Sequence, residues 1–402
     1  MPTKDHEFND DTRTISNDVS HPLYLFIIWE KSREKTDLIF DDMKKKFVIR
    51  EVYEVTWSKK KFINNLKRFY GTISTAQQKA ELFGAGPFLL VLVSDPNPKF
   101  TELETIKGID IINKNIFDSK KLYRKWIGQD FAIHSSISEK ESNHNLTLFF
   151  GKHAKDFEKL LPEKWDNTIK KLDSELAGHN GWKDMRQLLY VLNGTNHYVV
   201  LRNFEELPDK LNQKDIDILS ENSLIGYIIN PDFLPKKDHV SNITINISDT
   251  DILFDLKYVR DHYFDKKWSN DILKRRVLHP NGFYVPCKED YFFTLLYHAI
   301  FQKPSSFSKY KKTLISLSEE LHKNNNEDNL LNDFDKSKKF LKKYMTKMGY
   351  QDTASSQYKI LHNVAFQKAK TAIFLLKTEG IKFLMSAIKA KIKRKFSKSP
   401  SL

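Results

Sequence analysis

The chain contains almost no cysteine, because Cys287 is the single one among 402 residues. A lone cysteine excludes an intrachain disulfide and a cysteine-rich zinc site, which fits a reducing cytosol. The chain also lacks a run of eighteen apolar residues, so no transmembrane helix is expected. Residues 1–21 are polar and acidic, without the apolar stretch of a secretory signal. These absences predict a cytoplasmic protein with a disordered leader at 1–21.

Charge is strongly unbalanced, with a net charge of +14 that indicates an anionic partner. Seven basic residues and no acidic ones lie between Lys382 and Lys398, interleaved with apolar side chains. On a helix this pattern is typical of docking on an anionic membrane surface, here the inner membrane, at about 1 kcal/mol per basic residue. The alternative is a helix that packs on its own domain. Nucleic acid is less favoured, because the segment lacks a regular aromatic platform.

Strand and helix patterns alternate through residues 22–151, which predicts an α/β domain. The expected strands are 22–29, 47–55 and 86–93, and the expected helices are 30–46, 58–70 and 118–126. Asp118 is the expected N-cap of the last helix. The strand at 86–93 is apolar throughout, so we expect it at the centre of a sheet.

One string in this domain is a candidate for phosphoryl chemistry: Ile133-His134-Ser135-Ser136-Ile137-Ser138, followed by Glu141-Ser142. It resembles the active-site segment of nucleoside diphosphate kinases. The resemblance implies a ferredoxin-like domain in which His134 is the phosphate-carrying nucleophile and Arg124 a phosphate contact. The chain departs from that pattern at Ile137, where the family has an acidic residue. Binding of a phosphorylated ligand, or packing against the other half, are the alternatives.

The rest of the chain divides at polar breaks. Residues 152–184 are expected to form a helical linker, with a hinge at 178–182, where two glycines occur. A central domain follows at 185–322. An Asn-rich break then precedes a C-terminal helical region at 329–402, which includes the basic segment.

The most informative string is Lys214-Asp215-Ile216-Asp217-Ile218-Leu219, which has the alternation of a β-strand. Alternation places Asp215 and Asp217 on one face and the two isoleucines on the other. Adjacent carboxylates repel each other unless a cation lies between them. The pair therefore fits a Mg²⁺-dependent phosphoryl or nucleotidyl transfer site. The alternative is an exposed edge strand that carries two aspartates.

The surroundings of this pair resemble the nucleotidyltransferase fold of the DNA polymerase β superfamily, over about residues 185–300. An apolar strand precedes Arg202-Asn203, and a later strand, 251–256, carries Asp255. The resemblance implies a mixed-sheet domain in which Asp215, Asp217 and Asp255 hold Mg²⁺ or Mn²⁺. Arg202-Asn203 lies where the family has Gly-Ser or Gly-Gly, so Arg202 would contact phosphate by charge.

Lys257 and Arg260 are further candidate phosphate contacts near Asp255. Together these features predict a Mg²⁺-dependent nucleotidyl- or phosphoalditol-transferase of α+β class. Its donor would be a nucleoside triphosphate or a CDP-alditol, and its acceptor a lipid-linked or phosphorylated glycan. By analogy, such a protein would act in capsule or lipopolysaccharide biosynthesis at the inner membrane face. The alternatives are a phosphohistidine enzyme that uses His134 and a non-catalytic nucleotide-, lipid- or RNA-binding module with a degenerate nucleotidyltransferase fold.

Overall fold

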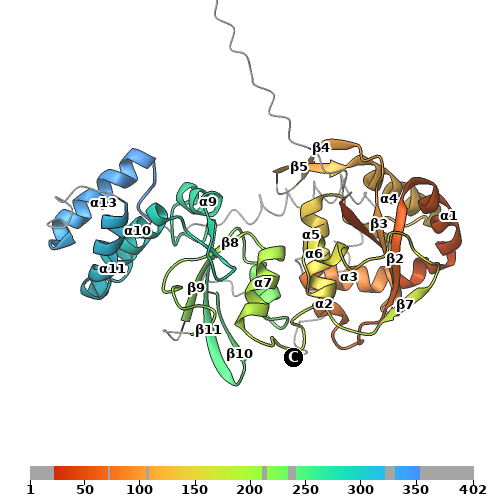
Figure 1. Cartoon of the computed structure of the whole chain (residues 1–402), viewed down its shortest axis with the longest axis horizontal. Coiled ribbons are helices and arrows are strands. Elements are labelled where there is room, and N and C mark those ends of the chain that lie inside the picture. The colour runs from red at the N-terminus through yellow and green to blue at the C-terminus, as the bar shows by residue number, and fades with distance from the viewer. Residues whose placement is uncertain are drawn as a thin grey trace, which may run out of the picture.

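A computed structural model of the chain describes residues 22–70, 73–105, 108–210, 215–233, 241–321 and 331–353. The predicted leader at 1–21 and the basic segment at 382–398 lie outside the described residues. Helices and strands are mixed along the chain, and its sheets contain both parallel and antiparallel pairs, so the predicted α+β class is confirmed (Figure 1). Within the described ranges, no helix has the length and apolarity needed to cross a bilayer.

The N-terminal half contains a five-stranded sheet of order β6-β1-β3-β2-β7. Its strands are β1 Leu23–Ile28, β2 Val48–Val55, β3 Phe88–Ser94, β6 Ile133–Ser135 and β7 Ile169–Leu172. Antiparallel pairs join β6 to β1, β1 to β3 and β3 to β2, whereas β7 is parallel to β2. Helices also lie between β2 and β3, so the chain order departs from the β-α-β-β-α-β order of the predicted ferredoxin-like domain. Every residue of β1 and β3 is buried, which confirms the central place predicted for β3.

Helices cover both faces of this sheet (Figure 1). They are η1 Glu30–Lys35, α1 Thr36–Lys46, α2 Phe62–Tyr70, α3 Ile73–Phe83, α4 Lys114–Ile127 and α5 Glu139–Phe150. Alternate residues of β1 contact opposite layers, because neighbouring side chains on a strand point to opposite faces. Phe26 packs in a cluster with side chains of α1 and α4, whereas Leu25 and Ile27 belong to the larger cluster that contains α2 and α5.

Two predictions for this half are wrong. The helix α4 begins at Lys114 and is capped by Asn113, whose side chain accepts from Asn115 N and Ile116 N, so Asp118 is not its N-cap. A separate hairpin, β4 Phe100–Thr105 with β5 Gly108–Asn113, leads directly into this cap and leaves Phe100 and two isoleucines of β5 exposed. The helix therefore starts where the strand ends, one turn earlier than the sequence suggested.

The predicted helical linker at 152–184 is also wrong. Only the short α6, Ala154–Glu158, is helical there, and β7 pairs in parallel with β2 at the edge of the N-terminal sheet. Trp165 packs edge-on against Phe40, and its backbone N–H donates to Ile49 O at 2.9 Å. These contacts make the segment part of the N-terminal domain.

The central region contains a four-stranded sheet of order β10-β11-β9-β8. Its strands are β8 Tyr198–Val200, β9 Asp215–Ser220, β10 Ser241–Ile247 and β11 Thr250–Tyr258. The helices beside it are α7 Met185–Thr195, α8 Ile225–Ile229 and α9 Lys266–Lys274, and a small ribbon follows, β12 Val277–Leu278 with β13 Tyr284–Val285. β9 and β11 are parallel, whereas the outer pairs are antiparallel.

Helices follow the central sheet (Figure 1), and all but the last lie within 185–322, the range predicted for the central domain; the last lies in the range 329–402 predicted to be helical. They are α10 Lys288–Tyr297, the π-helical turn η2 His298–Gln302, the short η3 Pro304–Ser306, α11 Phe307–Glu320 and α13 Phe334–Met348. Aromatic side chains join these helices to α9: Trp268 stacks on Tyr350 with ring centroids 5.0 Å apart.

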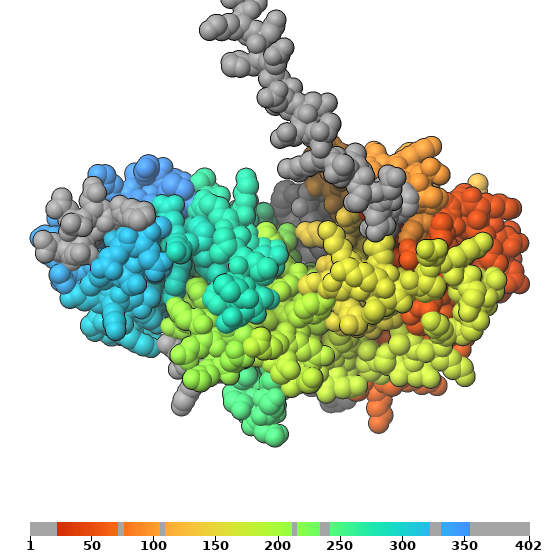
Figure 2. Space-filling model, in the orientation of Figure 1, coloured from red at the N-terminus to blue at the C-terminus, as the bar shows by residue number. Residues whose placement is uncertain are grey.

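The two halves share one buried core. The space-filling view shows a surface that is continuous from one half to the other (Figure 2). Arg68 of α2 is 2 % exposed and donates to four backbone oxygens, those of Leu176, Ala177, Tyr227 and Ile228. Burial lowers the pKa of Arg68 to about 9, so the guanidinium stays charged at neutral pH. At the predicted hinge, Trp182 is buried and its indole N–H donates to Ile229 O at 2.9 Å. The hinge prediction is therefore wrong.

Candidate functional site

The parallel pairing of β9 with β11 brings the three predicted aspartates together. Asp217 lies directly opposite Asp255, and Asp215 lies opposite Leu253. Paired residues on neighbouring strands point to the same face, so all three carboxylates share one face of the sheet. Ile216 and Ile218 are buried on the other face, as the alternation predicted.

The three carboxylates differ in their exposure to solvent. Asp217 is 3 % exposed, whereas Asp215 and Asp255 are half-buried. The pKa of Asp217 is raised to about 6, mainly by burial; Arg202 opposes the rise, and the neighbouring Asp255 and Asp215 contribute to it. The central carboxylate is thus the one that most needs a positive partner.

Two cations of the chain already contact this face. Arg202 follows β8, and its Nη2 donates to Asp217 Oδ1 at 2.6 Å, with both side chains buried. Lys257 lies two residues after Asp255 on the same strand, and its Nζ donates to Asp255 Oδ1 at 2.6 Å. The side chain of Asp215 makes no hydrogen bond or ion pair with another described residue. The cluster therefore holds three carboxylates and two cations.

Asn203 explains how the chain turns without the expected glycine. Its φ is 55°, in the left-handed region that glycine adopts freely and asparagine tolerates best among the other residues. The backbone at this position therefore keeps a conformation that suits a small-residue turn, while the side chain before it, Arg202, points into the cluster. Arg202-Asn203 in place of two small residues therefore adds a positive charge to the cluster and preserves the turn.

Sequence reasoning missed Tyr263, which supports both cations. Its hydroxyl accepts from Arg202 Nη1 at 3.1 Å, and Lys257 Nζ lies 4.7 Å from its ring centroid. The Asp261 carboxylate accepts from the backbone N–H of Tyr263 at 2.8 Å. This loop turns through Arg260 and His262, both with positive φ. A left-handed turn at residues other than glycine has no clear sequence signature, which is why the tyrosine was not predicted.

The C-terminal helices contact the same tyrosine. His298 Nδ1 lies 3.4 Å from the Tyr263 hydroxyl and 3.1 Å from Gln302 Oε1. Gln302 Nε2 donates to Tyr263 O at 3.0 Å. Burial, with a smaller contribution from the charge of Arg202, lowers the pKa of His298 to about 4, so the imidazole is neutral at pH 7. This histidine holds the tyrosine and is not a charged phosphate contact.

The remaining predicted residues do not join the cluster. Arg260 is exposed at the loop turn, and no hydrogen bond or ion pair links it to the described carboxylates. His134 and Arg124 lie in the N-terminal domain, on β6 and α4. Arg124 Nε donates to Ile133 O at 2.8 Å, which fixes the end of α4 against β6.

His134 is held by its neighbours in the N-terminal core. It is 8 % exposed, its Nε2 lies 3.1 Å from Asn145 Nδ2, and the rings of Phe69 and Tyr70 pack edge-on against it. Burial holds the pKa of His134 well below its ordinary value, and the charges of Lys120 and Lys79 act in the same direction. The imidazole is neutral, as a nucleophile must be, but the nitrogen nearest Asn145 is already occupied.

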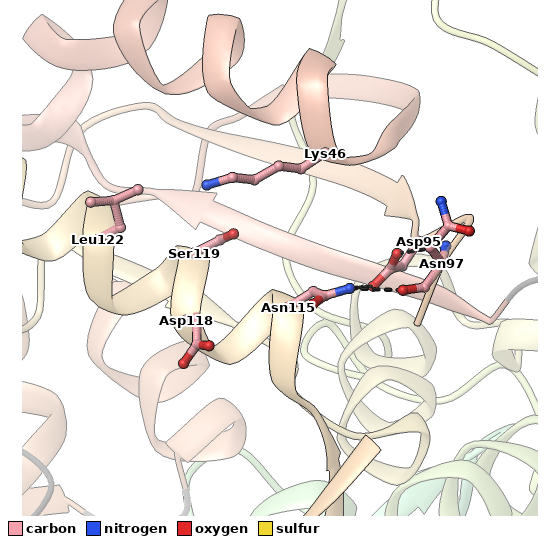
Figure 3. Close-up of a pocket in the computed structure, with 7 residues that line it drawn as sticks. All are labelled: Lys46, Asp95, Asn97, Asn115, Asp118, Ser119 and Leu122. Carbon is pink, nitrogen blue, oxygen red and sulfur yellow. Dashed lines mark hydrogen bonds between the residues drawn. The ribbon is translucent and has the colours of Figure 1, made fainter. Parts of the chain in front are cut away.

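No group of three or more His, Cys, Asp or Glu side chains in the described ranges is arranged to hold a metal ion. The two ion pairs give a physical reason, because Arg202 and Lys257 each occupy an oxygen that an ion would use. A hollow of about 430 Å³ lies elsewhere, between α1 and α4 (Figure 3). Its lining residues are Lys46, Asp95, Asn97, Asn115, Asp118, Ser119 and Leu122. Asp95 there accepts from Asn113 and Asn115, so its carboxylate orders the start of α4.

Comparison with known proteins adds no assignment: no protein family, curated protein or solved structure matches this chain. The geometry of the carboxylate face is therefore the basis for assigning a function.

Proposed function

We propose that the chain is a Mg²⁺-dependent (or Mn²⁺-dependent) nucleotidyl- or phosphoalditol-transferase whose metal ligands are Asp215, Asp217 and Asp255. One observation carries the proposal: the register of β9 with β11 sets Asp217 opposite Asp255, with Asp215 on the same face. Three carboxylates that converge from two parallel strands form a donor set of the kind that holds metal ions for phosphoryl transfer. This arrangement is the one that the resemblance to nucleotidyltransferases implies.

The three carboxylates are donors of the type that magnesium prefers, although with their two ion pairs in place they are not arranged as a metal site. Mg²⁺ prefers oxygen ligands, keeps several waters, and is bound through one or two carboxylates together with substrate phosphates. Asp215 has no partner among the described residues, and Asp217 and Asp255 each have a second carboxylate oxygen beyond the one in its ion pair. When bound, the ion would neutralise charge that develops on the transferred phosphoryl group.

The cations of the chain supply the other half of such a site. Arg202 carries a planar fork of donors that matches phosphate oxygens, and Lys257 offers a compact positive charge. Both lie beside the carboxylates, where the phosphates of a nucleoside triphosphate or CDP-alditol donor would be placed. A lipid-linked or phosphorylated glycan acceptor, and cytoplasmic action at the inner membrane face, remain proposals that rest on the basic segment at 382–398.

A second candidate function is a non-catalytic module that binds nucleotide, lipid or RNA. The observation that favours it is the pairing of two of the three carboxylates with cations of the same chain. A fold that has lost its metal could be stabilised in this way. The phosphohistidine alternative is less favoured, because Asn145 and two aromatic rings enclose His134.

The test is donor turnover by the full chain, followed by mass spectrometry. The protein is incubated with Mg²⁺ and each of the four nucleoside triphosphates or a CDP-alditol, beside Asp215→Asn. Asp215→Asn removes a proposed ligand without breaking an ion pair, so the fold should be kept. The matched control is Asp251→Asn, at an exposed site earlier on β11.

The proposal expects metal-dependent consumption of one donor by wild type and Asp251→Asn, and loss of at least 100-fold in Asp215→Asn, since a ligand to the charge-neutralising ion is removed. Full turnover in Asp215→Asn would refute the metal assignment. Binding of a nucleotide without consumption in any variant would favour the non-catalytic module instead.

A further inference from the structure

The ion pairs of the carboxylate face bear on how a metal would enter, an inference that rests on the proposed function. Asp217 and Asp255 are each neutralised by a cation of the chain, at 2.6 Å in both pairs. Counting Asp215, the cluster carries a charge of minus one before any ligand arrives. A site for a free divalent ion gains from a larger negative charge, so this cluster is poorly prepared for Mg²⁺ alone.

To bind Asp217 through the oxygen that Arg202 holds, a free metal ion would also have to separate the buried pair. The side chains of Arg202 and Asp217 are 8 % and 4 % exposed. A guanidinium that loses its carboxylate in a buried site, without a new partner, carries a large desolvation penalty. The metal would therefore compete both with the attraction inside the pair and with the burial of the released cation.

A polyphosphate removes this obstacle, because it offers both cations a new anion. Guanidinium binds phosphate oxygens with two parallel hydrogen bonds, and ammonium binds them as a point charge. We propose that Arg202 and Lys257 are exchangeable counter-ions, which make metal binding conditional on a polyphosphate ligand. The cations move from carboxylate to phosphate, and the carboxylates become free for the ion that accompanies the phosphates.

Tyr263 provides the pivot for this exchange. Its hydroxyl accepts from Arg202 Nη1, the donor that Asp217 does not use, and its ring lies under Lys257 Nζ. The tyrosine is fixed from two sides, by Asp261 at its N–H and by Gln302 at its carbonyl. Both cations can therefore change their anionic partner while they keep a contact with a fixed ring, so Tyr263 acts as a positioning residue.

Coupling of this kind must be reciprocal. If polyphosphate raises the affinity of the site for metal, metal raises the affinity for polyphosphate by the same factor. The proposal therefore has two binding signatures that do not depend on turnover. Removal of either counter-ion should also strengthen the binding of free metal, because an unpaired carboxylate is then available.

The first measurement is the binding of free Mn²⁺ to the full chain by electron paramagnetic resonance, without phosphate. The variants are Arg202→Met and Lys257→Met, which keep an unbranched apolar stem and remove the charge. Lys266→Met, at an exposed position on α9, is the control for a change in net charge. Circular dichroism verifies that each variant is folded. We expect Mn²⁺ to bind either site variant at least 10-fold more tightly than wild type, and Lys266→Met to equal wild type.

The second measurement is calorimetric titration with inorganic tripolyphosphate, alone and as its preformed 1:1 Mg²⁺ complex. Wild type should bind the complex at least 10-fold more tightly than tripolyphosphate alone, and Arg202→Met should lose most of that difference. Wild type that binds free Mn²⁺ as tightly as both variants overturns the inference, while the proposed function stands if Asp215→Asn abolishes turnover. Absence of Mn²⁺ binding in wild type and variants, with or without tripolyphosphate, overturns both.

Discussion

The strength of the buried Arg202–Asp217 pair can be measured by a double-mutant cycle. The single variants are Asp217→Asn and Arg202→Met, and the third protein carries both changes. Each single change leaves the other member of the pair charged and buried, with side chains 8 % and 4 % exposed. Breaking a buried pair in this way costs about 3–5 kcal/mol in the free energy of unfolding. Removing both charges is expected to cost far less than the sum, because no buried charge remains alone.

The expected coupling follows from the geometry of the pair. The donor and acceptor atoms are 2.6 Å apart, which places the two charge centres at about 4 Å. Coulomb attraction at that separation is about 4 kcal/mol with an effective dielectric constant of about 20. Tyr263 still accepts from Arg202 in the Asp217→Asn variant and lowers the penalty somewhat. We therefore expect a coupling energy of about 2–4 kcal/mol.

Urea unfolding of the full chain, followed by tryptophan fluorescence, gives the four free energies. Thermal melts should agree, with a fall in Tm of about 2–4 °C per kcal/mol for domains of 150–250 residues and less for longer chains. The two single changes would add without coupling if the pair did not exist in solution. A coupling energy below about 0.5 kcal/mol would therefore refute the pair, and with it the counter-ion argument.

Three further predictions concern other parts of the chain. Arg68→Met should lower the free energy of unfolding in urea by about 3–5 kcal/mol, because four backbone carbonyls lose a charged donor, whereas Lys60→Met, at an exposed site, should change it by less than about 0.5 kcal/mol. Equal effects would contradict the role of Arg68 in joining the two halves. Asn203→Ala should lower stability by about 1 kcal/mol in thermal melts and Asn203→Gly by much less, since φ is 55° there; an alanine variant as stable as the glycine variant would exclude the left-handed turn. Deleting residues 382–402 should weaken co-sedimentation with anionic liposomes and leave donor turnover intact; unchanged sedimentation would remove the case for a membrane role.

The sequence predicted the face of the carboxylates but not all of its chemistry. Period-two alternation was enough to place Asp215 and Asp217 together, with Ile216 and Ile218 behind them. The place of Asp255 opposite Asp217 depends on a parallel register, which the crossover between the two strands sets and which no local pattern encodes. Only the resemblance to a known fold suggested that third carboxylate.

The role of Arg202 could be predicted only in part from the sequence. A positive side chain after a strand predicted a phosphate contact, whereas its burial against Asp217 depends on how β8, β9 and the loop around Tyr263 pack. That loop reverses through Arg260 and His262 at positive φ, a region that only a few per cent of residues other than glycine adopt, so backbone propensity does not predict the turn. Tertiary contacts, above all those of Asp261, override the local preference.

The prediction of a helical linker at 152–184 was wrong for a different reason. Its one strand, Ile169-Lys-Lys-Leu172, lies at a sheet edge with three of its four residues exposed, so it lacks the apolar alternation that identifies a strand. Polar residues on an edge strand protect it against pairing with strands of other chains. The same residues remove the hydrophobic alternation by which a strand is predicted. A polar segment of this length therefore favours a helix over a strand when only hydrophobic alternation is considered.

The tie between the halves has a consequence for how such a chain can evolve. Arg68 reaches backbone oxygens on both sides of the seam, and Trp182 donates across it to Ile229. Recombination that exchanged the N-terminal half for an unrelated one would leave apolar surface and unpaired carbonyls at this boundary. The two halves should therefore be inherited together, and variation in specificity is expected in surface loops rather than through shuffling of domains.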